Sequence, residues 1–217
     1  MKTAFDLSAN HELLRKGCKL STKSWAWVED TQQAVRRVEG ARAALAAISE
    51  TASLRHLVVG VIGPRDATEA EYDIACRLGE ELGALGVTVI CGGKSGVMEA
   101  VCRGVDAAGG LAIGVLPGHA PQEANDFVSI PLPTGLSEAR NMVIAKSARV
   151  LIAVGGSYGT LTEVAYGLHF SKVVIGLQNA PPVDGMTKAS SVKDAIELAA
   201  AALIASAEPA PQVGAMS

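Results

Sequence analysis

The sequence predicts an α/β protein: a doubly wound, Rossmann-like, mostly parallel sheet with helices on both faces, preceded by an N-terminal helical extension. Hydrophobic residues make up 49% of the 217 residues and aromatic residues only 4%, so small aliphatic side chains must build the core. That composition suits helices packed on a buried parallel sheet. Between about Leu57 and Ala205, short apolar runs alternate with amphipathic stretches, an order that implies right-handed βαβ crossovers.

Six short apolar runs predict the strands. Most of them are continuous rather than alternating, as expected for strands that are covered on both faces. They span residues 57–62, 86–91, 111–116, 126–130, 149–154 and 172–177. Apolar residues at helical spacing predict the intervening and following helices over residues 68–85, 95–108, 136–147, 158–170 and 190–205.

The two ends of the chain differ from this middle part. From Ser24 to Glu50, apolar residues recur at helical spacing and predict a helix; they are Val28, Val35, Val38, Ala41, Leu45 and Ile48. The last residues are rich in Pro and Ala, which is typical of disorder. We therefore expect a helical extension over residues 1–55, a Rossmann-like domain over 56–206 and a disordered tail over 207–217.

Charge and motif content exclude several classes of function. The formal net charge is −3, so we expect neither nucleic acid nor a membrane as a partner. No apolar run approaches the ~20 residues of a transmembrane helix, and the N-terminus lacks the apolar segment of a signal peptide, which favours the cytoplasm. The four cysteines form no CxxC pair and the four histidines form no HxH or HExxH motif, so we expect neither a metal nor a cofactor.

Three turns at strand ends are candidates for a ligand site, because doubly wound sheets bind ligands beyond the carboxyl ends of their strands. The first, "IGPRDATEAE", contains Gly63, and its Thr68 and Glu71 match a capping box that opens the next helix. The second, "CGGKSGVMEAV", contains Gly92, Gly93, Gly96, Val97 and Met98. The third, "VGGSYGT", contains Gly155, Gly156, Ser157, Tyr158, Gly159 and Thr160.

The second and third turns both read Gly-Gly-x-x-Gly, and both lead into a predicted helix. Free backbone N–H groups at a helix start bind anions, and glycine lets the backbone approach a phosphate closely. One such turn alone is equally compatible with tight strand-to-helix packing. Two in one sheet favour a phosphate-bearing ligand, although neither matches GxGxxG or the P-loop pattern.

Two charged residues stand out by position. Arg140 lies where Thr134 or Ser137 can cap a helix, and a cation in the first turn opposes the helix dipole by about 0.3–1 kcal/mol. A bound anion would relieve that cost; a solvated arginine balanced by Glu138 is the alternative. Glu163 follows the third turn, where the dipole favours its ionised form. It either stabilises the helix start or is a catalytic carboxylate that stabilises positive charge on a sugar or activates water.

The segments "GGKSGVMEAV" and "SEARNMVIAKSARVLIAVGGSYGTLTE" resemble the family long labelled lysine decarboxylase-like, over roughly residues 57–180. This family includes the LONELY GUY-type phosphoribohydrolases and the molybdenum-cofactor carrier proteins. The resemblance implies a nucleotide-binding domain and a homo-oligomer, either a dimer or a tetramer. The catalytic arginine and glutamate of the family fall on Arg140 and Glu163. Its glycine-rich segments fall on Gly92, Gly93, Gly96, Val97 and Met98, and on Gly155, Gly156, Gly159 and Thr160.

The resemblance implies that the chain binds a nucleoside 5'-monophosphate, or a related phosphorylated small molecule, and hydrolyses its N-glycosidic bond to a free base and ribose 5-phosphate. The sequence departs from the hydrolase motif PGGxGTxEE, because Val154 replaces the proline and Thr162 the first glutamate. Asn141 also follows the arginine where the hydrolases usually have lysine. With these differences, the sequence is closer to the carrier-like branch of the family. The alternative is therefore a non-catalytic carrier or sensor of molybdenum cofactor or another phosphorylated, nucleotide-like ligand.

Overall fold

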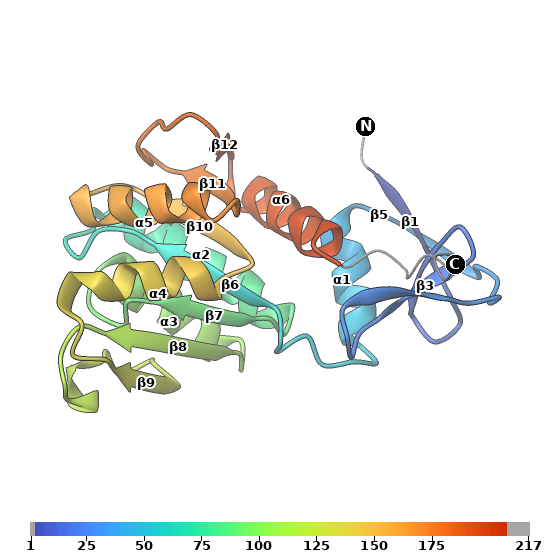
Figure 1. Ribbon diagram of the computed structural model, residues 1–217, viewed down its shortest axis with the longest axis horizontal. Helices are drawn as coiled ribbons and strands as arrows, with labels where there is room; N and C mark the ends of the chain where they lie inside the picture. Colours follow the sequence, from blue (N-terminus) through green and yellow to red (C-terminus); the bar gives the residue numbers. More distant parts are fainter. Residues whose placement is uncertain (1–2, 208–217) are drawn as a thin grey trace, which may run out of the picture.

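The computed structural model describes residues 3–207 and contains two sheets (Figure 1). The larger sheet has seven strands in the order β12-β11-β10-β6-β7-β8-β9, and every neighbouring pair is parallel. Its strands are β6 (Val58–Ile62), β7 (Thr88–Cys91), β8 (Leu111–Leu116), β9 (Ile130–Pro133), β10 (Val150–Val154), β11 (Val173–Leu177) and β12 (Thr187–Lys188). The predicted Rossmann-like fold is confirmed, although β9 begins where the predicted strand 126–130 was expected to end.

Helices cover both faces of this sheet (Figure 1). On one face pack α2 (Glu69–Ala84), α3 (Val97–Ala107) and α6 (Val192–Ala205); on the other pack α4 (Arg140–Ser147) and α5 (Tyr158–His169). The side chains of β10 alternate between the two hydrophobic clusters, with Ile152 in one and Leu151 in the other. This burial on both faces explains why the strands read as continuous apolar runs. The predicted capping box of Thr68 and Glu71 opens α2.

The order of the strands reverses between β6 and β10. From β6 the chain proceeds through β7 and β8 to β9 at one edge, and it then returns to β10 on the other side of β6. The carboxyl ends of β6 and β10 therefore form the topological switch point, where ligands bind in folds of this kind. Two short 3-10 turns, η1 (Pro121–Glu123) and η2 (Ser137–Ala139), lie on the chain between β8 and β10.

The N-terminal part is an antiparallel sheet rather than a mostly helical extension. Its elements are β1 (Ala4–Leu7), β2 (Leu13–Arg15), β3 (Cys18–Ser21), β4 (Ala26–Glu29), β5 (Arg36–Glu39) and α1 (Ala41–Ser49). The helix predicted from Ser24 to Glu50 is wrong before Ala41. Trp25 has a φ of 52°, which an α-helix does not allow. Val35, counted in the predicted apolar stripe, is 67% exposed.

The N-terminal sheet is anchored to α6, the last of the helices that pack on the larger sheet (Figure 1). Trp25 is buried, and its Nε1 donates to the Leu203 carbonyl at 2.8 Å. Glu197 of α6 accepts hydrogen bonds from the backbone N–H groups of Ala41 and Arg42, at 2.6 and 3.2 Å. Because the N-cap residue of α1 is a glycine without a side-chain cap, this carboxylate takes the place of one.

Two negative findings apply to residues 3–207. No helix there is long and apolar enough to cross a membrane. Within the same residues, no group of three or more His, Cys, Asp or Glu side chains could hold a metal ion. The predicted disordered tail lies, from residue 208 onward, outside the described residues, and the domain boundary at residue 56 stays a prediction.

Candidate functional site

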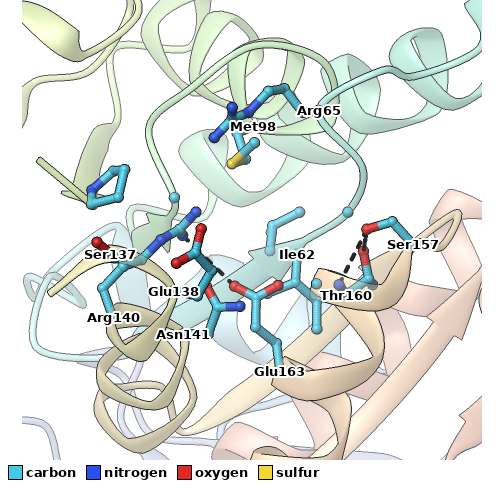
Figure 2. Close-up of a pocket in the computed structure, with 15 residues that line it drawn as sticks. Ile62, Arg65, Met98, Ser137, Glu138, Arg140, Asn141, Ser157, Thr160 and Glu163 are labelled. Atoms are coloured by element: carbon cyan, nitrogen blue, oxygen red, sulfur yellow. Dashed lines mark hydrogen bonds and ion pairs between the residues drawn. The ribbon is translucent and has the colours of Figure 1, made fainter.

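A cavity of about 210 Å³ lies at the carboxyl ends of β6, β7 and β10, at the switch point (Figure 2). Several residues singled out in the sequence line it: Gly63, Gly92, Met98, Arg140, Ser157, Gly159, Thr160 and Glu163. The turns after residues 62, 91 and 154 therefore each contribute to one cavity, and α4 and α5 supply its buried charged residues, Arg140 and Glu163.

The start of α5 opens into this cavity. Ser157 is the N-cap, and its Oγ accepts a hydrogen bond from the Thr160 N–H at 3.3 Å. The N–H groups of Tyr158 and Gly159 have no intrahelical acceptor because they belong to the first turn. Gly159 lines the cavity, and a Cβ on it would meet only Ser157 Oγ, at 3.7 Å, so its side-chain position is open. An open helix start of this kind suits a phosphate group.

Arg140 is a buried cation with unused donors. The sequence had suggested Thr134 or Ser137 as the cap of α4, and this is wrong. The N-cap is Ala139, which has no side-chain hydrogen bond. Arg140 is only 8% exposed, and its guanidinium lies against Gly92, where any Cβ would collide with it. Among the described residues, its Nε and Nη1 have no hydrogen-bond partner. Burial lowers the pKa of Arg140, but a guanidinium keeps its charge in proteins.

Glu163 faces Arg140 from α5. Its Oε1 lies 3.8 Å from Arg140 Nη1, too far for a hydrogen bond (Figure 2). Burial raises the pKa of Glu163 to about 8, and the opposing attraction of Arg140 does not cancel that effect. The helix dipole favours the ionised form of Glu163, as expected, but desolvation outweighs it at a side chain that is only 6% exposed. Burial therefore favours the protonated form of this carboxyl group.

The second glycine-rich turn is mostly used for packing. Its residues Gly93, Gly96 and Val97 do not line the cavity. The Val97 N–H donates to the Pro64 carbonyl at 3.1 Å, and a Cβ on Gly96 would collide with the carbonyl oxygen of Arg65. The loop after β6 therefore fills the start of α3, and the anion site expected at this turn is not open.

Three residues of the third turn also lie outside the cavity. The Gly155 N–H donates to the carbonyls of Leu177 and Gln178, at 3.2 and 2.7 Å, so it is not free for a ligand. Gly156 packs against Pro181. Tyr158 is 92% exposed, and its side chain points away from the core. Only its backbone N–H contributes to the open helix start.

Sequence reasoning missed several lining residues: Val61, Ile62, Arg65, Pro117, Ser137, Glu138 and Asn141. Arg65 lies across the cavity from Arg140 (Figure 2), and its charge lowers the pKa of Arg140. A signal for Arg65 was present, because it is the second residue after Gly63 in a turn that the switch-point rule indicates. Glu138 and Asn141 flank Arg140 in the sequence, but nothing in the pattern shows which way their side chains point.

Two relatives cover much of the larger unit. An uncharacterized protein of Archaeoglobus fulgidus is 37% identical over 143 residues, which are 66% of this chain and 94% of that protein. A probable cytokinin riboside 5'-monophosphate phosphoribohydrolase of Oryza sativa subsp. japonica, LOGL5, is 33% identical over 118 residues. That match covers 52% of this chain, and it spans only about half, 48%, of the rice protein.

A solved structure extends the likeness. The molybdenum cofactor binding protein of Rippkaea orientalis is 36% identical, with a TM-score of 0.63, and the match covers 67% of this chain and 96% of that one. These findings confirm the family resemblance read from the two glycine-rich segments. The N-terminal sheet lies outside the matched family segment, which begins at residue 56. This chain belongs to the SLOG cluster4 family, which it matches over residues 56–211.

Proposed function

We propose that the chain hydrolyses the N-glycosidic bond of a nucleoside 5'-monophosphate and releases a free base and ribose 5-phosphate. The observation that carries the proposal is the buried pair of Arg140 and Glu163 in a cavity beside the open start of α5. Burying a cation with unpartnered donors costs stability, so such a group points to a missing anionic partner. The rice relative, named as a phosphoribohydrolase, supports the same reaction.

In this proposal, the ligand's phosphate binds at the start of α5. The N–H groups of Tyr158 and Gly159 donate to it, and the helix dipole strengthens both bonds. Arg140, which lines the cavity, donates from its guanidinium to the phosphate or to a ribose hydroxyl. Arg65 supplies a second cation from the opposite wall, and its guanidinium has no hydrogen bond or ion pair within residues 3–207.

Glu163 acts as the general acid. Its raised pKa favours the protonated form, and it donates that proton to the nitrogen of the departing base as the C–N bond breaks. A protonated carboxyl cannot stabilise positive charge on the sugar by its own charge. The acid role therefore replaces the two roles that the sequence had suggested for this residue.

The second candidate is a carrier or sensor that binds a phosphorylated ligand without cleaving it. The likeness to the Rippkaea orientalis molybdenum cofactor binding protein, which the match covers almost completely, favours it. Thr162 favours it too, because the hydrolase motif has a glutamate there. The same cavity serves this reading, with Arg140 and the start of α5 holding the phosphate.

We also propose that the chain forms a homo-oligomer, a dimer or a tetramer, through the face that carries α4 and α5. Large apolar side chains are exposed there beside the cavity: Leu136, Met142, Tyr158 and Leu161. Exposed apolar side chains gathered on one face are typical of interaction surfaces. Light scattering coupled to gel filtration measures the assembly directly, and a monomer at micromolar concentration would refute it.

The test of the function is incubation with a panel of nucleoside 5'-monophosphates, followed by chromatography for free base and ribose 5-phosphate. We expect release by the wild type and by the matched control Glu69→Gln, which changes an exposed glutamate outside the cavity, and none by Glu163→Gln. If no nucleotide is cleaved but one raises Tm, the carrier reading replaces the hydrolase. A ligand at 100 times its Kd adds about 2.7 kcal/mol to the free energy of unfolding, enough for a clear shift.

A further inference from the structure

A second carboxylate, that of Glu138, lines the same cavity as Glu163 (Figure 2). It comes from η2, directly before α4, and its side chain is exposed to water. Within residues 3–207 it has no hydrogen-bond or ion-pair partner, although it is close enough to Arg140 to favour the charged guanidinium. The other charged side chains that face this cavity are Arg65, Arg140 and Glu163.

The backbone around Glu138 is held in place by specific contacts. The Ser137 N–H donates to the Pro117 carbonyl at 3.0 Å, and the Gly135 N–H donates to the Gly118 carbonyl at 2.8 Å. These bonds fix η2 to the segment that follows β8. Ser137 itself has a φ of 48°, a left-handed backbone conformation that residues other than glycine seldom adopt. Strained residues of this kind concentrate at functional sites.

Thr162, which stands where the hydrolase motif has its first glutamate, supplies no group to this cavity. Its hydroxyl donates to the Gly159 carbonyl at 2.7 Å and accepts from Asn141 Nδ2 at 3.1 Å. The first bond lies within α5, and the second joins α5 to α4. Helix α5 thus provides one carboxyl group to the cavity, and η2 provides the other.

We propose that Glu138 is a second catalytic carboxylate, the general base that activates the attacking water. This inference rests on the proposed hydrolysis. Glu138 takes a proton from water while the water oxygen bonds to the anomeric carbon. The C–N bond breaks, its electron pair goes to the base nitrogen, and that nitrogen takes the proton from Glu163. Proton exchange with solvent restores both groups, so the sum is nucleotide plus water giving base plus ribose 5-phosphate.

The different surroundings of the two carboxyl groups suit these two roles. Glu163 is buried, and its raised pKa keeps the proton that an acid must donate. Glu138 is exposed, so water reaches it directly. Glycoside hydrolysis commonly uses such a pair, with one carboxyl group as acid and the other acting on water or on the sugar. When one carboxyl group of a pair is buried and the other is exposed, the two are suited to different roles, one as acid and one as base.

The test compares Glu138→Gln, Glu138→Asp and the control Glu69→Gln with the wild type on the nucleotide that the panel identifies. We expect Glu138→Gln to lower kcat by roughly 10²–10⁴-fold and to leave KM within about threefold. We expect Glu138→Asp to recover part of that loss and Glu69→Gln to match the wild type. In Glu138→Gln the rise of activity on the acid side of the pH profile should disappear, which a merely structural residue would not cause.

Each other outcome is decisive. A kcat in Glu138→Gln within threefold of the wild type overturns the role of Glu138 and leaves the hydrolase intact. So does a loss that appears in KM alone, because it would make Glu138 a binding residue. Failure of the wild type to cleave any nucleotide overturns the proposed function, and the catalytic role of Glu138 with it. Because Glu138 is exposed, we expect its variants to keep the wild-type Tm.

Discussion

The two glycine-rich turns share a sequence pattern but differ in what their backbones contact. After β7, the turn from Gly92 to Gly96 is covered by the loop that follows β6, and the Val97 N–H is already bonded. After β10, the turn from Gly155 to Gly159 ends in an open helix start. The same Gly-Gly-x-x-Gly pattern thus serves close packing in one place and access for a ligand in the other.

From the segment after β7, Gly92 and Met98 line the cavity, and Gly92 does so by what it lacks. Its missing side chain leaves the space that the Arg140 guanidinium occupies. A glycine can therefore contribute to a site by accommodating a charged side chain rather than by exposing its own N–H. Substitution of a glycine in the turn after β7 should therefore lower stability, whereas substitution in the turn after β10 should weaken ligand binding.

The largest effect on stability is expected for Gly96→Ala. Gly96 has φ 69° and ψ −130°, a region essentially limited to glycine, and a Cβ would collide with backbone oxygens. We expect the free energy of unfolding to fall by about 3 kcal/mol or more in urea titrations. The matched variant Gly159→Ala should stay within about 1 kcal/mol of the wild type, yet bind phosphate ligands more weakly. Equal stability of the two variants would refute the comparison.

The next effect is expected for Gly92→Ala. The new Cβ displaces the Arg140 guanidinium, at a cost of about 1–3 kcal/mol in the free energy of unfolding. Misplacement of a catalytic group by about 1 Å can lower activity by about 10²-fold, so kcat/KM should fall by at least that factor. Steady-state kinetics on the nucleotide that the wild type cleaves measures it. Wild-type kinetics in this variant would mean that Arg140 has no part in the reaction.

Glu163→Gln tests the buried carboxyl through pH. The pKa of Glu163 rises from its ordinary value of 4.5 to about 8 on folding, so between those values the native state binds more protons than the unfolded state. The wild type therefore loses stability as pH rises through this window, by at most about 1.4 kcal/mol per unit. Glu163→Gln lacks this loss. In thermal unfolding, the Tm of the variant relative to that of the wild type should therefore rise from pH 5 to pH 9. A constant difference would contradict the raised pKa.

The smallest effect on the fold is expected for Tyr158→Ala. Tyr158 is 92% exposed, so its removal should change the free energy of unfolding by less than about 0.5 kcal/mol. Self-association should weaken if the face of α4 and α5 is the interface. A loss above 1 kcal/mol in the monomer would show that this side chain packs on its own chain.

Much of the larger unit could be predicted from sequence because burial on both faces leaves continuous apolar runs. The strand predicted over 149–154 contains β10, and the helix predicted over 158–170 contains α5. The N-terminal sheet could not be predicted in the same way. Its strands are three or four residues long, and the spacing of Val28, Val35 and Val38 also fits a helix.

Sequence reasoning selected Arg140 and Glu163 from their places near strand ends and helix starts, and both line the cavity. It failed for Arg65 and Glu138, because their access to the cavity depends on how loops from distant parts of the chain pack. It also misjudged Gly96, since a pattern of glycines does not show which N–H groups are already bonded. The raised pKa of Glu163 depends on burial, which no local spacing reveals.

In the proposed site, the start of α5, and not the start of α3, receives the anion. Titration of ¹⁵N-labelled protein with inorganic phosphate and with ribose 5-phosphate, followed by amide chemical shifts, tests it directly. We predict saturable shifts of the Tyr158 and Gly159 amides, with the Gly96 and Val97 amides unchanged. Shifts of equal size at Gly96 and Val97, or no saturable shift at Gly159, would contradict it.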